Sequence, residues 1–224
     1  MDKTISIEKA LDHVKDGDSI MYGGFGPAGF PSALVEELAK RDLKDLTVIA
    51  EDMGGDSVHT SALFKDSKKV RNLLTSYPRR NEEIQRRYFE NDFDFVEVMP
   101  MGTFVERIRC GGSGIAAFLT RAGLNTDTEI GKEKMTVDGK EYLLETALKA
   151  NIALVYANKA DKWGNLVING RSKNFNVVMA MAADFVIAQA FDIVEVGDID
   201  PDDVTIPAVL VDAVVKVEES VYGI

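Results

Sequence analysis

The order of apolar and polar positions along the chain predicts strands and helices in alternation. Short apolar runs rich in β-branched residues, typical of buried strands, alternate with segments whose apolar residues recur at helical spacing. The predicted strands are residues 19–22, 46–50, 69–75, 95–99, 153–157, 185–188 and 209–215. The predicted helices are residues 6–14, 31–40, 82–90 and 176–183. This alternation, with short connections, predicts one open, mostly parallel sheet flanked by helices.

A β-hairpin interrupts this pattern at residues 135–142, which read MTVDGKEY. An Asp-Gly pair between alternating residues is typical of a type I′ turn, so we expect a small β-hairpin flap centred on Asp138 and Gly139. No internal repeat, low-complexity tract or Pro/Gly/Ser-rich linker divides the chain. We therefore expect residues 1–224 to form a single α/β domain.

The first predicted strand is followed by GGFGPAGFP, in which Gly24, Gly26 and Gly29 form the pattern GxGxxG. With Glu51 near the end of the next strand, this resembles the fingerprint of dinucleotide-binding folds. In that fingerprint a helix begins beside the second glycine. Here such a helix would contain both Pro27 and Pro31, and Pro31 would disrupt its hydrogen bonds. A helix that begins at Pro31 is favoured instead, which leaves residues 23–30 as a loop.

Three interpretations of this loop stay open. A dinucleotide site is the least favoured, because the loop is too long to place a pyrophosphate on the helix N-terminus. The loop is otherwise a connection without a ligand, or it presents backbone N–H groups to an acyl or anionic ligand. We favour the last interpretation, since glycines let a ligand approach the main chain closely.

Charge and composition exclude several classes of protein. The formal net charge of −11 argues against nucleic-acid binding, which needs clustered Lys and Arg. No segment approaches the ~20 consecutive apolar residues of a membrane helix, and the N-terminus has no pattern of a signal peptide. The single cysteine, Cys110, forms no internal disulfide. We therefore expect a cytoplasmic protein with no membrane partner.

Several isolated residues have ordinary structural explanations. His13 and His59 have no metal-ligating neighbour at suitable spacing, so we expect surface histidines and no metal site. Cys110 is interpreted as a buried structural thiol, and Ser113 lacks the GxSxG spacing of a nucleophile. We expect Trp163 to pack a turn.

The carboxylates are interpreted in the same way. Glu106 lies three residues before Arg109 and can pair with it along a helix. Glu51 and Asp52, which close a predicted strand, are expected to be surface or turn residues. None of these carboxylates is therefore expected to be catalytic.

Four stretches together carry a more specific resemblance. They read GGFGPAGFPSALVEELAK; SYPRRNEEIQRRYFENDFDFVEVMPMGTFVERIRCGGSGIAAFLTRAGLNT; VDGKEYLLE; and ANKADKWGNLVINGRSKNFNVVMAMAAD. In this order, over nearly the whole chain, they resemble the α subunit of family I coenzyme A transferases of the acetate/butyrate–acetoacetate or 3-oxoacid type. The resemblance implies the coenzyme A transferase (NagB/RpiA-like) α/β fold. It also implies an αβ or α2β2 assembly with a β subunit.

The resemblance further implies a reaction. In the family, coenzyme A moves from an acyl-CoA donor to a short-chain carboxylic or 3-oxo acid acceptor through a glutamyl-CoA thioester. Coenzyme A thioester is thus a substrate, and no tightly bound cofactor is expected. The nucleophilic glutamate sits on the β subunit, and its motif has no match here. We therefore expect no catalytic residue in this chain, which would form half of an active site.

The same resemblance implies which residues bind substrate. The backbone of Gly24, Phe25 and Gly26 should line the acyl pocket. Asn81 matches an asparagine that in the family follows a Gly-Glu pair, where this chain has Arg79-Arg80. A second glycine turn of the pocket wall is expected, matched by Gly111, Gly112 and Gly114.

Met101 departs from the family pattern. The family generally reads Pro-Gln-Gly-Thr where this chain reads Pro-Met-Gly-Thr. A methionine offers flexible apolar volume and no N–H donor. We therefore expect this pocket to take a different or more apolar acyl group than acetoacetate.

Two other classes of function stay open at this point. The chain could be a ligand-binding sensor module without catalytic activity, although no DNA-binding segment accompanies it. It could also be a nicotinamide-dependent dehydrogenase, if the glycine pattern held a dinucleotide.

Overall fold

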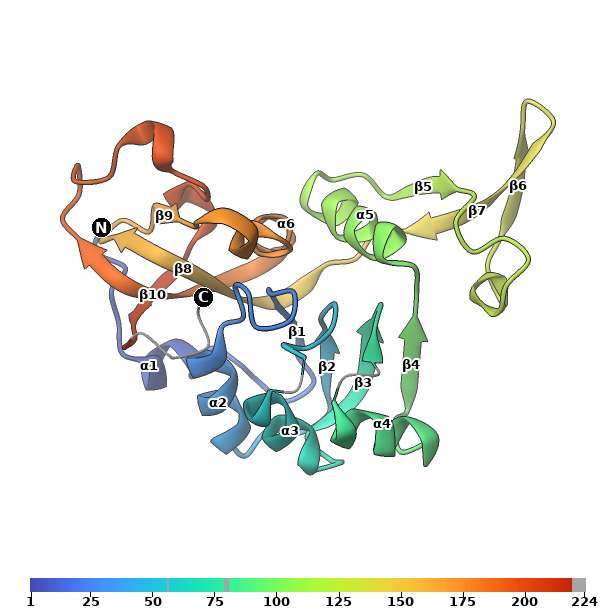
Figure 1. Ribbon diagram of the computed structural model, residues 1–224, viewed down its shortest axis with the longest axis horizontal. Helices are drawn as coiled ribbons and strands as arrows, with labels where there is room; N and C mark the ends of the chain where they lie inside the picture. The colour runs from blue at the N-terminus through green and yellow to red at the C-terminus, as the bar shows by residue number, and fades with distance from the viewer. Residues whose placement is uncertain (56, 79–80, 219–224) are drawn as a thin grey trace.

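A parallel sheet forms the centre of the molecule, with strands in the order β11-β10-β8-β1-β2-β3-β4 (Figure 1). Every neighbouring pair in this order is parallel, and the short β9 pairs antiparallel with β8. The computed structural model describes residues 1–55, 57–78 and 81–218. The strands are β1 (Ser19–Tyr22), β2 (Leu46–Ile49), β3 (Val70–Thr75), β4 (Phe95–Val98), β8 (Ala150–Asp161), β9 (Leu166–Val167), β10 (Ala183–Val194) and β11 (Ala213–Lys216).

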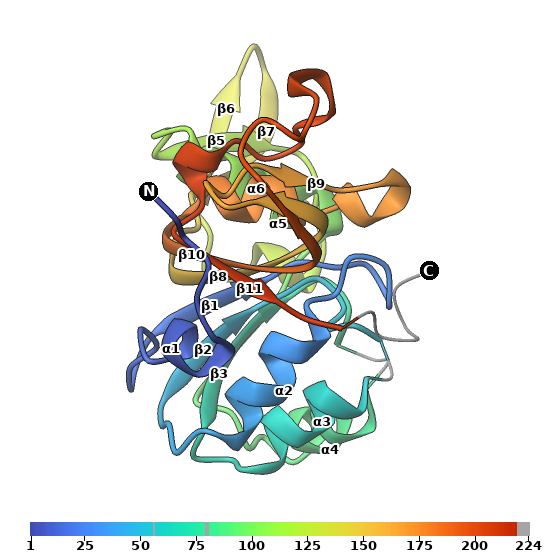
Figure 2. The same cartoon turned by 90° about the vertical axis from the view of Figure 1, so that its left-hand side faces the viewer.

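Helices cover both faces of this sheet, and each face has its own hydrophobic core (Figures 1 and 2). One face packs on α1 (Ile7–Leu11), α2 (Ser32–Lys40), α3 (Val58–Lys65) and α4 (Glu82–Phe89). The other packs on α5 (Met101–Gly112) and α6 (Asn176–Met181). Short 3₁₀ turns are η2 (Asp127–Glu129), η3 (Gly170–Lys173), η4 (Pro201–Asp203) and η5 (Ala208–Leu210).

A second, smaller sheet projects beside α5 (Figure 1). It is antiparallel, in the order β5 (Ala117–Thr120), β7 (Lys140–Thr146), β6 (Lys134–Val137). Between β6 and β7, Asp138 and Gly139 have φ of 50° and 72°. Positive φ at both central residues is what a type I′ turn requires, so the predicted hairpin is confirmed.

A network of four charges joins the small sheet to α5 and β4. Arg107 on α5 is 2.8 Å from Glu97 on β4 and 3.8 Å from Glu145 on β7. Lys132 completes the network at 2.6 Å from Glu145 and 3.4 Å from Glu97. Arg107 and Glu145 are buried, and Arg107 Nε also donates to the carbonyl of Thr146. Removing one partner would leave a buried charge unpaired, so the network fixes how the small sheet is attached.

Most predicted elements are confirmed, and the exceptions have local causes. The 6–14 segment is helical only as α1, with Ser6 as its N-cap. The predicted strand 209–215 is wrong over its first half, where η5 ends at Leu210 and Val209 is exposed; only β11 is extended there. Helix α3 was not predicted. Of α5, only the pairing of Glu106 with Arg109 along a helix was expected, and it forms at 2.6 Å. The sequence of α5 begins with MGT and ends with CGG, which are not typical of a helix. Its apolar face, which includes Phe104 and Ile108, is nevertheless buried.

Gly111 shows why α5 ends in glycines. A Cβ on Gly111 would lie 1.9 Å from the carbonyl oxygen of Leu148, and one on Gly112 would lie 2.7 Å from the Met181 side chain. The last turn of α5 therefore packs directly on the chain entering β8 and on the end of α6. These contacts leave no space for any side chain at either position.

We predict that Gly111→Ala lowers the free energy of unfolding by about 2–3 kcal/mol, because backbone must move to admit the methyl group. Gly102→Ala in the first turn of α5 is the matched control, since nothing lies within 4 Å of the added atom. That control should leave stability unchanged or raise it by up to about 1 kcal/mol. Urea unfolding of the two variants checks this, and equal midpoints would contradict the packing explanation.

Candidate functional site

The strand order places a topological switch point at the carboxyl ends of β1 and β8. From β1 the chain builds outward through β2 and β3 to β4, and then returns to place β8 on the other side of β1. Ligands of open α/β sheets bind at such a switch point, outside the carboxyl ends of the strands. The loop that follows β1, residues 23–30, is the glycine loop, and it lies at this point.

The glycine loop has the length that the prolines predict. Its centre is a tight turn in which Phe25 and Ala28 exchange backbone hydrogen bonds of 3.0 and 3.2 Å. Gly24, Gly26 and Gly29 have φ of 117°, 56° and 69°, a region that glycine adopts freely. Helix α2 begins only after Pro31, so the helix start expected of a dinucleotide site is absent from this loop.

The N-terminus of α2 is capped from a distant strand. Pro31 contributes no capping side chain, and Gln189 on β10 instead accepts from the N–H groups of Ala33 and Leu34 at 3.1 and 3.3 Å. This buried amide occupies the position where the dinucleotide fold holds a phosphate. The dinucleotide interpretation is therefore not supported.

The N–H groups of Gly24, Phe25 and Gly26 are already used inside the chain. Gly24 donates to Asn174 Oδ1 at 3.1 Å, and Gly26 donates to Asp52 Oδ2 at 2.7 Å. Phe25 donates to Ala28 within the turn. The expectation that the loop presents these donors to a ligand is therefore wrong for this conformation. The exposed residues of the loop are Phe25, which is 47% exposed, and Pro27, whereas Gly24, Gly26 and Gly29 are buried.

Asp52 begins a turn, as expected, with the N–H of Gly55 donating to its carbonyl, but it and Glu51 are buried and do not lie on the surface. Asp52 accepts from Gly26 and, at 3.2 Å, from the N–H of Gly54, so it ties the loop after β1 to the loop after β2. Glu51 accepts from Ser76 Oγ at 2.7 Å. Beneath them, burial raises the pKa of Tyr22 far above its ordinary value, which keeps its hydroxyl protonated. These groups support the loops and do not face a substrate.

Asn81 has a structural role in this conformation. It is the N-cap of α4, where its side chain accepts from the N–H groups of Glu83 and Ile84. Its amide also donates to Ser61 Oγ at 2.9 Å, and the residue is buried. The neighbouring Arg79-Arg80 lie outside the described residues.

Met101 lies on the same edge of the sheet as the glycine loop. It is the first residue of α5, directly after β4, and is 45% exposed. β4 is three strands from β1, or about 14 Å at ~4.8 Å per strand. The first N–H groups of a helix have no acceptor within it, and Pro100 provides no capping side chain.

The second glycine cluster, Gly111, Gly112 and Gly114, does not form the turn that was expected beside the glycine loop. Gly111 and Gly112 belong to the last turn of α5, and the turn begins at Ser113. Gly114, with φ of 71°, ends the helix in the manner usual for glycine, and it is exposed like Ser113. The structure therefore separates this cluster from the other predicted site residues.

The remaining candidates hold structural places. His13 follows α1 and stacks on Phe185 at 4.0 Å between ring centroids. His59 lies in α3, and its Nδ1 is 3.4 Å from Glu36 Oε2. Trp163 is 51% exposed. Within residues 1–55, 57–78 and 81–218, no group of three or more His, Cys, Asp or Glu could hold a metal ion.

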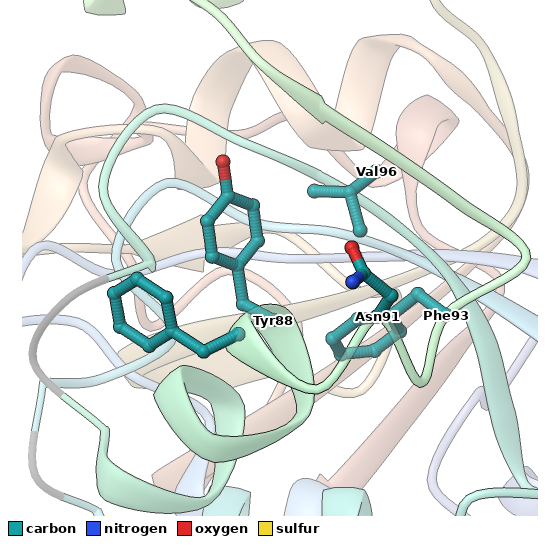
Figure 3. A pocket seen from close by; sticks show the side chains of 5 residues that line it. Tyr88, Asn91, Phe93 and Val96 are labelled. Carbon is teal, nitrogen blue, oxygen red and sulfur yellow. The ribbon is translucent and has the colours of Figure 1, made fainter.

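A shallow groove lies on the outer side of α4 and β4. It has a volume of about 350 Å³ and is lined by Tyr88, Phe89, Asn91, Phe93 and Val96 (Figure 3). Among these five residues, Asn91 alone carries an amide or charged side chain. The groove is at the end of α4 and the start of β4, so it opens at the opposite ends of the strands from the glycine loop.

Asn174 and Asn176, which hold the glycine loop, were not among the predicted site residues. Asn174 accepts from Gly24 and donates to the carbonyl of Ala28 at 2.8 Å. Asn176 donates to the carbonyl of Gly29 at 2.9 Å. Their only sequence signal is an NFN run before an apolar helix, which does not reveal a partner about 150 residues away.

Comparisons with known proteins now decide the family. The family model described as Coenzyme A transferase matches residues 4–217. This chain belongs to that family. It is 38% identical over 218 residues to the alpha chain of the acetate CoA-transferase of Escherichia coli K12, covering 97% of this chain and 98% of that one. It is 39% identical over 214 residues to the alpha chain of the acetoacetyl-CoA:acetate/butyrate CoA transferase of Clostridium acetobutylicum, covering 96% and 97%.

Solved structures agree on the fold. An acyl-CoA transferase apoenzyme from Escherichia coli O157:H7 superposes with a TM-score of 0.86 at 21% identity, covering 96% of this chain. This chain spans 47%, about half, of that solved chain. The predicted fold class and the resemblance to the α subunit of a coenzyme A transferase are confirmed.

Family membership sets the function in general terms. The chain has a role in the transfer of coenzyme A, and the family acts on coenzyme A thioesters. Because both relatives are named as alpha subunits, their names imply a partner subunit in those enzymes. Among the residues that the structure describes, no helix is both long and apolar enough to cross a membrane.

Cys110 is buried in α5, and burial together with the nearby Glu106 carboxylate raises its thiol pKa. We predict that the native chain reacts with Ellman's reagent at pH 8 more slowly than the urea-unfolded chain, by on the order of a hundredfold. One cysteine per chain makes the stoichiometry unambiguous. Native labelling at the unfolded rate would refute this placement of the thiol.

Proposed function

We propose that this chain is the α subunit of a two-chain coenzyme A transferase. It would act with a β subunit to move coenzyme A between an acyl-CoA donor and a short-chain carboxylic or 3-oxo acid acceptor. The observation that carries the proposal is its near full-length alignment with chains named as alpha subunits. That it spans about half of a solved acyl-CoA transferase chain also supports a missing second half.

The proposed reaction uses a glutamate of the β subunit. Its carboxylate attacks the thioester carbonyl, the C–S bond breaks, and a mixed anhydride and the coenzyme A thiolate result. The thiolate then attacks the glutamyl carbonyl, which releases the donor acid and leaves a glutamyl-CoA thioester. The acceptor carboxylate runs these steps in reverse. Every bond broken in one half is remade in the other, so no further reactant is needed.

The carboxylates near the glycine loop support this division of labour. Asp52 is held by the N–H groups of Gly26 and Gly54, and Glu51 by Ser76. Both are at most 3% exposed, so neither reaches an acyl-CoA in this conformation. The reaction needs a carboxylate that reaches the thioester carbonyl, and we propose that the partner chain supplies it.

The glycine loop is proposed as a wall of the acyl pocket. Phe25 is 47% exposed and projects from the loop, between Gly24 and Gly26, whose positive φ angles shape the main chain on either side of it. Met101 is proposed to line the same pocket from the start of α5. The packing of Asn81, Gly111 and Gly112 does not favour a binding role for them.

We predict that co-expression with the β subunit yields a complex of αβ or α2β2 mass that transfers coenzyme A from acetyl-CoA to butyrate or acetoacetate. Native mass spectrometry and a thioester assay measure the two properties. The chain purified alone is the control and should show no transfer. Full activity of the chain alone would overturn the proposed half-site.

We predict that Met101→Gln in the complex shifts acceptor preference from butyrate toward acetoacetate by about tenfold in the ratio of kcat/KM values. The amide would restore a donor for the keto oxygen that methionine lacks, and one such hydrogen bond is worth about that factor. Met135→Gln is the matched control, because Met135 is 42% exposed but lies in the small sheet. An unchanged ranking in Met101→Gln would exclude a role for this residue in specificity.

A further inference from the structure

We infer that Asn174 and Asn176, the asparagine pair, are positioning residues that hold the glycine loop in its working shape. Neither is proposed to touch substrate. The consequence for catalysis rests on the proposed function, whereas the effect on the loop itself does not.

Asn174 joins the two sides of the turn in the glycine loop. Its Oδ1 accepts the N–H of Gly24 at 3.1 Å, before the turn, and its Nδ2 donates to the carbonyl of Ala28 at 2.8 Å, after it. The same side chain binds its own segment, with Oδ1 accepting from the N–H of Phe175 and Nδ2 donating to the carbonyl of Arg171. One amide therefore fixes the width of the turn and its position over α6.

Asn176 joins the loop to the strand on the other side of the switch point. Its Oδ1 accepts from the N–H of Tyr156 in β8 at 2.9 Å, and its Nδ2 donates to the carbonyls of Gly29 and Ser172, both at 2.9 Å. The residue is fully buried. Because β8 and β1 are paired strands, this amide fixes the height of the loop above the carboxyl ends of these two strands.

The glycines of the loop are shaped to this pair. A Cβ on Gly23 would lie 2.0 Å from Asn176 Oδ1, and a Cβ on Gly29 would lie 2.4 Å from the carbonyl oxygen of Ser172 and 2.8 Å from Asn176 Nδ2. The close approach of the Asn176 amide therefore explains why residue 23 is a glycine. At residue 29 the same amide, the Ser172 carbonyl and the positive φ together explain the glycine. From the opposite side, Asp52 holds Gly26 at 2.7 Å.

A loop held on both sides is organised before any ligand arrives. Binding to it then costs little ordering entropy, and the reacting groups are positioned to fractions of an ångström. Loosening the loop should therefore reduce kcat/KM even where the fold is intact. This is the property that separates positioning from a general contribution to stability.

Asn174→Ala is the main variant, because Asn176→Ala would remove the partner of a buried β8 N–H and puts folding itself at risk. Asn176→Asp is the second variant, since it keeps the acceptor for Tyr156 and removes the donors to Gly29 and Ser172. Asn165→Ala is the matched control. Asn165 is also half-buried and bridges two segments, through Ala208 and Asp161, away from the glycine loop.

Hydrogen exchange of the full chain, followed by mass spectrometry, measures the loop directly. We expect exchange in peptides covering residues 23–30 to rise about tenfold in Asn174→Ala and in Asn176→Asp. Exchange in β10 should not change, and Asn165→Ala should leave the loop as in the wild type. Wild-type exchange in the loop of both variants would overturn the inference.

Kinetics of the complex with the β subunit then test the functional consequence. We expect Asn174→Ala to lower kcat/KM about tenfold at a Tm no lower than that of Asn165→Ala, whose kcat/KM stays at the wild-type value. Unchanged kcat/KM with a loosened loop would refute the positioning role. If the wild-type complex transfers no coenzyme A, the proposed function fails, whereas the exchange experiment still decides whether the pair holds the loop.

Discussion

Parallel pairing of β1 with β2 on one side and with β8 on the other is the constraint on which the site depends. The chain leaves β1 toward β2, β3 and β4, and later returns to place β8 on the other side of β1. The connections that follow β1 and β8 therefore run in opposite directions from the β1–β8 pair. α2 covers one face of the sheet and α6 covers the other. The loops that precede these two helices meet above the carboxyl ends of β1 and β8. The glycine loop and the asparagine pair are brought together by this topology, although they are about 150 residues apart.

The far edge of the sheet shows a second use of long-range contacts. β4 is an edge strand with exposed Phe95 and Val98, and the small sheet is attached beside it through Arg107, Lys132 and their two carboxylates. The network is electrically balanced, with two cations and two anions. A buried network of this kind gains little over apolar packing but costs several kcal/mol when one partner is lost. Its effect is therefore to specify one orientation for the small sheet.

Sequence reasoning predicted what local chemistry determines. The prolines at 27 and 31 set the length of the glycine loop, and the Asp-Gly pair set the hairpin, because both act through the φ angles of a few residues. It failed where a residue's surroundings come from distant segments. Glu51 and Asp52 lie at a turn, as the sequence indicates, but their burial comes from neighbouring loops that the sequence does not reveal. Gly111 and Gly112 look like a turn, and only the approach of Leu148 and Met181 shows that they are helical packing glycines.

The way the glycine loop is held bears on how the proposed reaction would be divided between two chains. Negative charge develops on a thioester carbonyl oxygen as it is attacked, and preorganised donors stabilise it. The N–H groups of Gly24, Phe25 and Gly26 all donate within the chain, so this loop supplies shape and not those donors. The first turn of α5 has N–H groups without intrahelical acceptors, and it carries Met101, which is proposed to line the same pocket. Under the proposed function, stabilisation of the oxyanion therefore falls to the chain that carries the glutamate or to the first turn of α5, and the glycine loop fixes where the acyl group lies when that glutamate attacks.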